Sequence, residues 1–119
     1  MSLNAIRVLV VEDEPLVAML LEDALLDAGA EVLGPVGTVA DALAMLEQLP
    51  DVALLDLRLG RDSAVPVADD MVVRGIPFAV MSGDVGGNLP VRHHPAPALA
   101  KPFSPDEAIR LLESIVARA

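Results

Sequence analysis

The chain has 119 residues, no cysteine and 54% hydrophobic residues, which describes one domain with its own core and excludes disulfide scaffolds and thiolate chemistry. Its 18 acidic and 8 basic residues give a formal charge of -10, which argues against nucleic acid and anionic membranes as partners. No apolar stretch approaches the roughly 20 residues of a bilayer span, and the first residues lack a signal-peptide pattern, so we expect a soluble cytoplasmic protein.

An apolar run over residues 6–11 predicts a first strand that is buried on both faces of a parallel sheet. The run stops at Glu12-Asp13-Glu14, and Pro15 then suits the first position of a helix. Apolar residues recur along that helix at three- and four-residue spacing until Gly29, and we expect this stripe to pack in the core. They are Leu16, Leu20, Ala24 and Leu25.

The strand-helix unit then repeats along the chain. Residues 31–36 predict a second strand, and Thr38 with Asp41 resembles a capping box that opens a helix up to Leu49. Residues 52–55 predict a third buried strand, which ends at Asp56. A loop over residues 57–63 then leads to a weaker helix.

The second half of the chain follows the same pattern with one interruption. A helix over residues 66–74, closed by Gly75, precedes a strand over residues 78–81. Residues 85–95 stand where a fourth helix belongs, but they contain two glycines and two prolines, so we expect a short, frayed or absent helix. A short strand over residues 96–100 and a helix opened by residues 104–107 complete an α/β pattern, with a parallel sheet covered by helices on both faces.

Polar residues stand directly after four of the predicted strands. They are Glu12-Asp13, Asp56, Ser82 and Lys101, which is the chain's one lysine. The carboxyl ends of parallel strands form the binding crevice of such sheets, so we expect these side chains to converge. Three carboxylates in one crevice call for a cation, and oxygen ligands suit Mg²⁺. Asp56 could then accept a phosphoryl group, with the hydroxyl of Ser82 and the ammonium of Lys101 holding its oxygens.

Each of these residues also has an ordinary structural explanation. An aspartate at a strand end commonly forms a turn or caps a helix, Ser82-Gly83 is a common turn, and a lone lysine usually lies on the surface. Only their joint occurrence in this order, with each at the correct strand end, favours the site. His93-His94 could supply half of a metal site, but no partner stands at ligand spacing, so we expect a solvated loop there.

Four motifs of the chain resemble the receiver domain of bacterial two-component response regulators. They are Val8-Leu9-Val10-Val11-Glu12-Asp13-Glu14-Pro15, Leu54-Leu55-Asp56-Leu57, Met81-Ser82-Gly83 and Ala100-Lys101-Pro102-Phe103. The resemblance covers nearly the whole chain and implies a single receiver domain over residues 1–119. It also implies a flavodoxin-like (CheY-like), doubly wound sheet of five parallel strands in the order 2-1-3-4-5, and a cis bond between Lys101 and Pro102.

The same resemblance implies a phosphorelay function. Asp56 would accept a phosphoryl group from a histidine kinase or histidine phosphotransfer protein, and the domain would catalyse only its own phosphorylation and dephosphorylation. Asp13, Asp56 and the backbone carbonyl of Arg58 would ligate Mg²⁺, with Glu12 acting through water. Ser82 and Lys101 would contact the phosphoryl group. Output would pass by protein contact to a downstream protein, from a monomer or weak dimer.

Two departures from the family concern the output. Receivers usually carry Tyr or Phe three residues before the lysine, where this chain has Ala98. The second departure is the Gly- and Pro-rich segment over residues 85–95. Both departures, together with residues 76–83, are similar to the receiver subgroup named for its Pro-Phe-x-Phe-Ala-Thr-Gly motif (FAT GUY), with Met81 and Ser82 replacing its Ala and Thr. Rearrangement of residues 85–95 would then transmit the signal. We also expect Arg58 and Asp84 to pair across the site and limit hydrolysis.

Other functions stay open from the sequence. A haloacid-dehalogenase-type phosphatase also uses an aspartyl nucleophile, but its second Asp two residues later is Arg58 here, and a cap domain is lacking. A degenerate receiver that acts as a phosphorylation-independent interaction module is a further alternative. A flavin mononucleotide carrier is disfavoured, because Glu12-Asp13-Glu14 would repel the phosphate. The chain ends with its fifth predicted helix region, so it is either a stand-alone receiver or a domain of a longer protein such as a hybrid kinase.

Overall fold

The computed structural model describes residues 3–83, 90–93 and 95–118. Five parallel strands form its main sheet, in the order β2-β1-β3-β6-β7. They are β1 (Arg7–Val11), β2 (Glu31–Val36), β3 (Val52–Asp56), β6 (Phe78–Ser82) and β7 (Ala98–Ala100). Counted along the chain within this sheet, the order is 2-1-3-4-5, so the expected sheet is confirmed.

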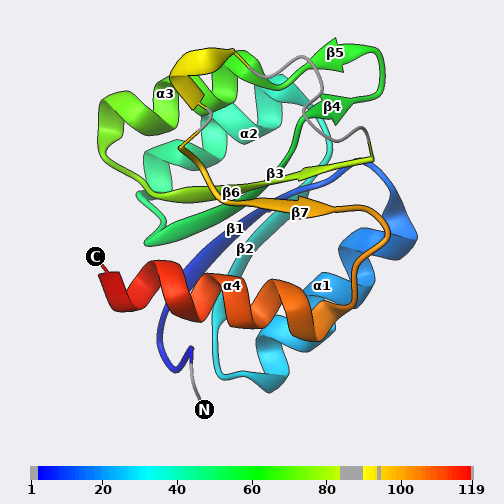
Figure 1. The fold of residues 1–119 in the computed structure, drawn as a ribbon, viewed down its shortest axis with the longest axis vertical. Helices are drawn as coiled ribbons and strands as arrows, with labels where there is room; N and C mark the ends of the chain where they lie inside the picture. Colours follow the sequence, from blue (N-terminus) through cyan, green and yellow to red (C-terminus); the bar gives the residue numbers. More distant parts are fainter. Residues whose placement is uncertain (1–2, 84–89, 94, 119) are drawn as a thin grey trace.

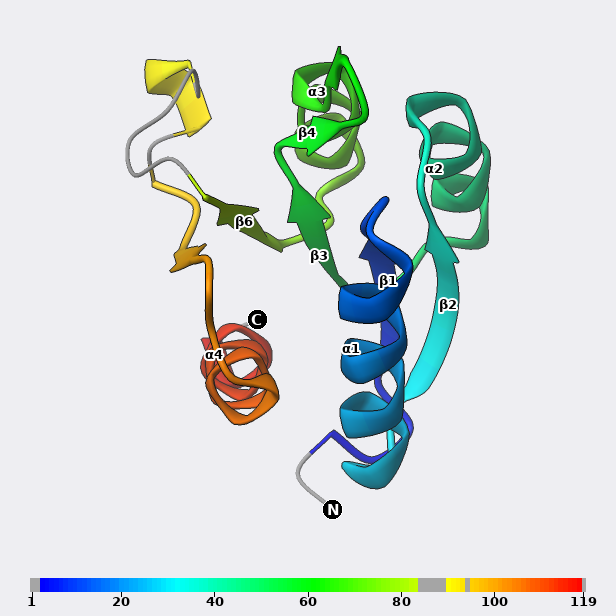
Figure 2. The same ribbon diagram turned by 90° about the vertical axis from the view of Figure 1, so that its right-hand side faces the viewer.

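Two helices cover each face of the sheet (Figures 1 and 2). On one face lie α1 (Pro15–Asp27) and α4 (Pro105–Arg118), and on the other lie α2 (Val39–Met45) and α3 (Val65–Arg74). The 3-10 helix η1 (Leu46–Gln48) continues α2. This layering explains the continuous apolar run of β1, because successive side chains of a strand point to opposite faces. Val8 and Val10 pack with α1 and α4, whereas Leu9 and Val11 pack with α2 and α3.

Local sequence signals set several helix ends as expected. The hydroxyl of Thr38 accepts a hydrogen bond from the backbone N–H of Asp41 at 3.1 Å, which caps α2. Ser104 and Glu107 bond reciprocally at the start of α4, each side chain accepting a hydrogen bond from the other's backbone N–H. Gly75 ends α3 with a φ of 71°, a left-handed conformation that glycine adopts without strain.

The apolar stripe predicted along α1 is wrong in part. Leu25 is fully buried, but Leu16 and Leu20 are 65% and 49% exposed, and Met19 beside them is 50% exposed. The buried face of α1 is formed instead by Ala18, Leu21 and Leu25. Because apolar residues occupy both sides of this helix, periodicity alone selected the wrong set of leucines.

Two connections differ from simple loops. Residues 57–63 contain a two-stranded antiparallel hairpin, β4 (Arg58–Leu59) with β5 (Asp62–Ser63), which the sequence did not predict. Between β6 and β7 the structure describes the 3-10 helix η2 (Val91–His93), in agreement with a short, irregular fourth helix. Residues 84–89 and 94 lie outside the described part, so the expected pair of Arg58 and Asp84 stays a prediction.

Two further observations concern sequence expectations. The Lys101-Pro102 bond is cis, as expected, and Gly34-Pro35 is a second cis bond. Among the described residues, every helix falls short of the length or apolarity that a bilayer span needs.

Candidate functional site

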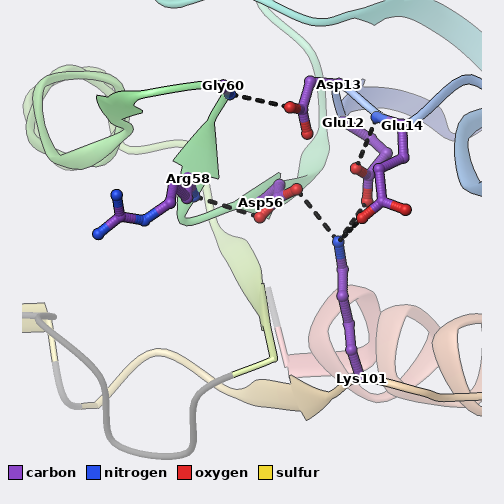
Figure 3. Close-up of polar contacts among 7 residues, drawn as sticks. All are labelled: Glu12, Asp13, Glu14, Asp56, Arg58, Gly60 and Lys101. Carbon is purple, nitrogen blue, oxygen red and sulfur yellow. Dashed lines mark hydrogen bonds and ion pairs between the residues drawn. The ribbon is translucent and has the colours of Figure 1, made fainter.

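The carboxyl ends of three strands bring four predicted site residues together (Figure 3). Glu12 and Asp13 follow β1, Asp56 is the last residue of β3, and Lys101 follows β7. Ser82 ends β6, and its backbone carbonyl accepts a hydrogen bond from the backbone N–H of Lys101 at 2.9 Å. The predicted polar residues therefore occupy one edge of the sheet, as parallel strands require.

The ammonium of Lys101 lies among three carboxylates. Its Nζ donates to Oδ2 of Asp56 at 3.1 Å and lies 3.0 Å from Oε1 of Glu12 and 3.5 Å from Oε1 of Glu14. Burial by itself would lower the pKa of Lys101, but its interactions with Glu12 and Asp56 outweigh burial and hold that pKa above its ordinary value. Lys101 therefore remains a fixed positive charge beside Asp56.

Glu12 is the most deeply buried acid of the cluster. Its residue is 3% exposed, and Oε2 accepts a hydrogen bond from the backbone N–H of Glu14 at 3.0 Å. Burial, with a smaller contribution from the neighbouring Asp56, raises the pKa of Glu12 to about 7, against the opposing effects of the Glu14 N–H and Lys101. The buried Oε1 receives no well-directed hydrogen bond, although Lys101 lies close to it.

Backbone N–H groups of the β4–β5 hairpin hold the other two carboxylates. Arg58 N–H donates to Oδ1 of Asp56 at 3.2 Å, and Gly60 N–H donates to Oδ2 of Asp13 at 2.8 Å. Burial would raise the pKa of Asp13, but the hydrogen bond from Gly60 contributes to holding it below its ordinary value. The side chain of Arg58 extends away from the acidic cluster (Figure 3).

The three carboxylates have the chemistry of a divalent-cation site. One carboxylate oxygen each from Glu12, Asp13 and Asp56 lies within 4.8 Å of the others, and the described residues contain no second group of this kind. Lys101 neutralises only part of their charge, and Oε1 of Glu12 lacks a hydrogen bond. Hard oxygen donors around an uncompensated negative charge fit Mg²⁺.

The sequence missed two contacts of the site and misplaced one histidine. Glu14 and Gly60 were not expected to touch the site residues, and neither carries a signal beyond its place beside a predicted turn. His93 is only 3% exposed, so the expected solvated loop is wrong at this residue. Its Nε2 lies 2.6 Å from Oδ1 of Asp69, and its ring packs edge-on against Phe78. His94 lies outside the described residues.

A doubly wound five-stranded sheet with this arrangement of acids and a lysine at its carboxyl edge defines a receiver-type domain. No family model matches the chain. Similar solved structures include that of SdrG from Sphingomonas melonis Fr1, with 38% identity, a TM-score of 0.81, and coverage of 94% of this chain and 97% of that one. A second SdrG structure, in a BeF3-activated conformation, has 38% identity and a TM-score of 0.77, covering 92% of this chain and 95% of that one.

Longer proteins also match the chain. The response regulator PhyR from Brucella abortus is 29% identical with a TM-score of 0.82, over 96% of this chain and 49% of its own. The transcriptional regulatory protein PdtaR from Mycobacterium tuberculosis is 32% identical over 117 residues, which are 94% of this chain and 57% of PdtaR. The chain thus spans little more than half of this curated relative. It belongs to the family of response regulator receiver domains.

Proposed function

We propose that this receiver domain is a cytoplasmic phosphoacceptor of a two-component phosphorelay, in which Asp56 receives the phosphoryl group. The observation that carries the proposal is the position of Lys101, whose Nζ lies 3.1 Å from Oδ2 of Asp56. A fixed cation beside a nucleophilic carboxylate stabilises the charge that develops on a transferred phosphoryl group. Ser82, at the end of the neighbouring strand β6, would contact another phosphoryl oxygen.

The transfer involves no change of oxidation state and therefore needs no oxidant or reductant. A carboxylate oxygen of Asp56 attacks phosphorus, an O–P bond forms, and the N–P bond of a phosphohistidine donor breaks. The imidazole nitrogen keeps the electron pair and takes a proton from water. Hydrolysis later releases inorganic phosphate and restores the carboxylate. Asp13, Asp56 and the carbonyl of Arg58 would hold Mg²⁺, with Glu12 acting through water, and the ion would supply further positive charge to the phosphoryl oxygens.

The surface beside the site fits a protein donor, such as a histidine kinase or histidine phosphotransfer protein. Leu16, Met19 and Leu20 expose an apolar face of α1, the helix that begins directly after the acidic turn. A cavity of about 360 Å³ adjoins this face, lined among others by Leu20, Lys101 and Phe103. A donor protein packed on this face would lie beside Lys101, and exposed apolar residues there favour protein contact. The output is a separate step, and we propose that it passes by protein contact through residues 85–95.

Intact mass after incubation with Mg²⁺ and acetyl phosphate tests the phosphoacceptor. We expect one added phosphoryl group on the native chain, lost on treatment with hydroxylamine, and none on Asp56→Asn. Asp41→Asn is a matched control, because Asp41 is exposed on α2. Beryllofluoride binding provides a second test, because some receivers are not phosphorylated by small-molecule donors. Failure of both would refute the proposal and favour a phosphorylation-independent interaction module.

A further inference from the structure

Asp13 and Asp56 lie at the carboxyl ends of different strands, and one short hairpin touches both. The two carboxylates follow β1 and end β3, which pair side by side in the sheet. Arg58 N–H donates to Asp56 and Gly60 N–H donates to Asp13, the latter across 47 residues of sequence. The two donors lie two residues apart on the same side of the site (Figure 3). They are therefore two contacts of one structural unit.

The hairpin is anchored well enough to fix these donors. Arg58 pairs with Ser63 and Leu59 pairs with Asp62 in its ladder. The side chain of Leu59 is buried in the core with α2 and α3. At the base, Leu57 N–H donates to the carbonyl of Met81, and Ala64 N–H donates to the carbonyl of Leu57. The ladder, the buried side chain and the base each restrict movement of the two N–H groups.

We propose that the β4–β5 hairpin is a main-chain clamp that sets the spacing of the Asp13 and Asp56 carboxylates for a divalent cation. Two like charges whose oxygens come within 4.8 Å repel each other, and each N–H donor offsets part of that repulsion. Each donor also occupies one carboxylate oxygen and thereby restricts the rotation of that side chain. Gly60 is thus a positioning residue for Asp13, and this inference rests on the proposed function.

The turn of the hairpin explains why residue 60 is glycine. Gly60 has a φ of 64°, a conformation that side chains other than Asn and Asp rarely adopt. A Cβ at this position would meet no atom within 4 Å, so a substitution disturbs the backbone and causes no clash. Gly75 offers a matched control, because it has a φ of 71°, equally open surroundings and a place at the end of α3.

The test measures Mg²⁺ affinity of the unphosphorylated full chain by calorimetric titration. We expect Gly60→Ala to weaken Mg²⁺ binding by about tenfold, as loss of a contact that orients a ligand typically does. Gly75→Ala should leave the affinity unchanged, and Gly60→Asn should retain most of it because Asn tolerates the left-handed conformation. Equal affinities for Gly60→Ala and Gly75→Ala would overturn the clamp and leave the phosphoacceptor proposal standing.

Hydrogen exchange of the Gly60 amide supplies a readout that needs no metal. We expect Asp13→Ala to accelerate that exchange at least tenfold in the metal-free chain, because the amide loses its acceptor. Unchanged exchange would overturn the clamp even if Gly60→Ala fails to fold. A native chain that binds no Mg²⁺ would overturn the proposed metal site, and the clamp's role with it.

Discussion

The imidazole of His93 lies 2.6 Å from the carboxylate of Asp69, which joins the 3-10 helix η2 to the helix α3. Arg92, next to His93, donates to both oxygens of the same carboxylate at 3.0 Å. Hydrogen bonds from Arg92 and then His93 lower the pKa of Asp69 to about 2. Asp69 thus attaches both Arg92 and His93 of η2 to the helix α3.

This attachment predicts that His93→Ala destabilises the domain. Truncation removes the hydrogen bond to Asp69 and the edge-on contact with Phe78 from a buried position. We expect the free energy of unfolding to fall by about 2 kcal/mol. In a double-mutant cycle with Asp69→Ala, the combined loss should be smaller than the sum of the single losses, because both changes remove one contact. Urea unfolding measures these values, with the exposed Val91→Ala as control. A loss no larger than that of Val91→Ala would contradict the prediction.

The buried Glu12 predicts a pH dependence of stability. The folded chain retains the Glu12 proton up to about pH 7, whereas an ordinary glutamate loses it near 4.5. Between these values the unfolded state binds fewer protons, so the free energy of unfolding falls as pH rises. The stabilisation is complete below pH 4.5 and is lost as pH passes 7. We expect a loss of about 1 kcal/mol, since solvent and Lys101 screen the charge.

Urea unfolding from pH 5 to pH 8 in the presence of a chelator measures this effect. Glu12→Gln should remove the contribution, because the amide resembles the protonated acid and does not titrate. Glu22→Gln on α1 serves as the matched control. Parallel stability curves for the native chain and Glu12→Gln over this pH range would show that Glu12 does not titrate as expected.

Lys101 should affect metal binding and phosphoryl transfer in opposite directions. Lys101→Met removes a positive charge that contacts Asp56 and Glu12, so Mg²⁺ should bind about fivefold more tightly. The rate of phosphorylation by acetyl phosphate should fall about 100-fold, because the developing charge loses its partner. Titration and mass spectrometry measure the two quantities. Lys101→Arg keeps the charge and should leave Mg²⁺ affinity near the native value. A Lys101→Met chain phosphorylated at the native rate would contradict the assigned role of Lys101.

The apolar face of α1 should matter only for protein donors. Leu16→Ser removes an exposed leucine beside the site, and we expect phosphoryl transfer from a phosphorylated histidine phosphotransfer domain to slow by about tenfold. Phosphorylation by acetyl phosphate should stay at the native rate. Val73→Ser, which alters a residue that is 84% exposed on α3, provides the control. Equal slowing by the two variants would place the donor surface elsewhere.

Much of the fold and the convergence of the site could be predicted from the sequence. Parallel strands buried on both faces give unbroken apolar runs, and the residue after each run stands at the carboxyl edge of the sheet. Glu12, Asp13, Asp56 and Lys101 therefore meet where the pattern places them. The strand order followed from the resemblance of the motifs to a known family.

The contacts that orient these residues were decided by tertiary structure. The bond from Gly60 to Asp13 uses a backbone N–H, which every residue except proline carries, so no side chain marks it in the sequence. His93 and Asp69 are 24 residues apart in the sequence. A spacing of that length does not predict a contact, because the contact forms only when η2 packs against α3. The sequence also did not show which face of α1 is exposed, because leucines lie on both sides of that helix. The sequence by itself determined which side chains meet at the sheet edge, because the residue at the carboxyl end of each strand directly follows that strand's apolar run. Only the tertiary structure decided the long-range contacts that hold Asp13, Asp56 and His93 in place, because Gly60, Lys101 and Asp69 come from distant segments.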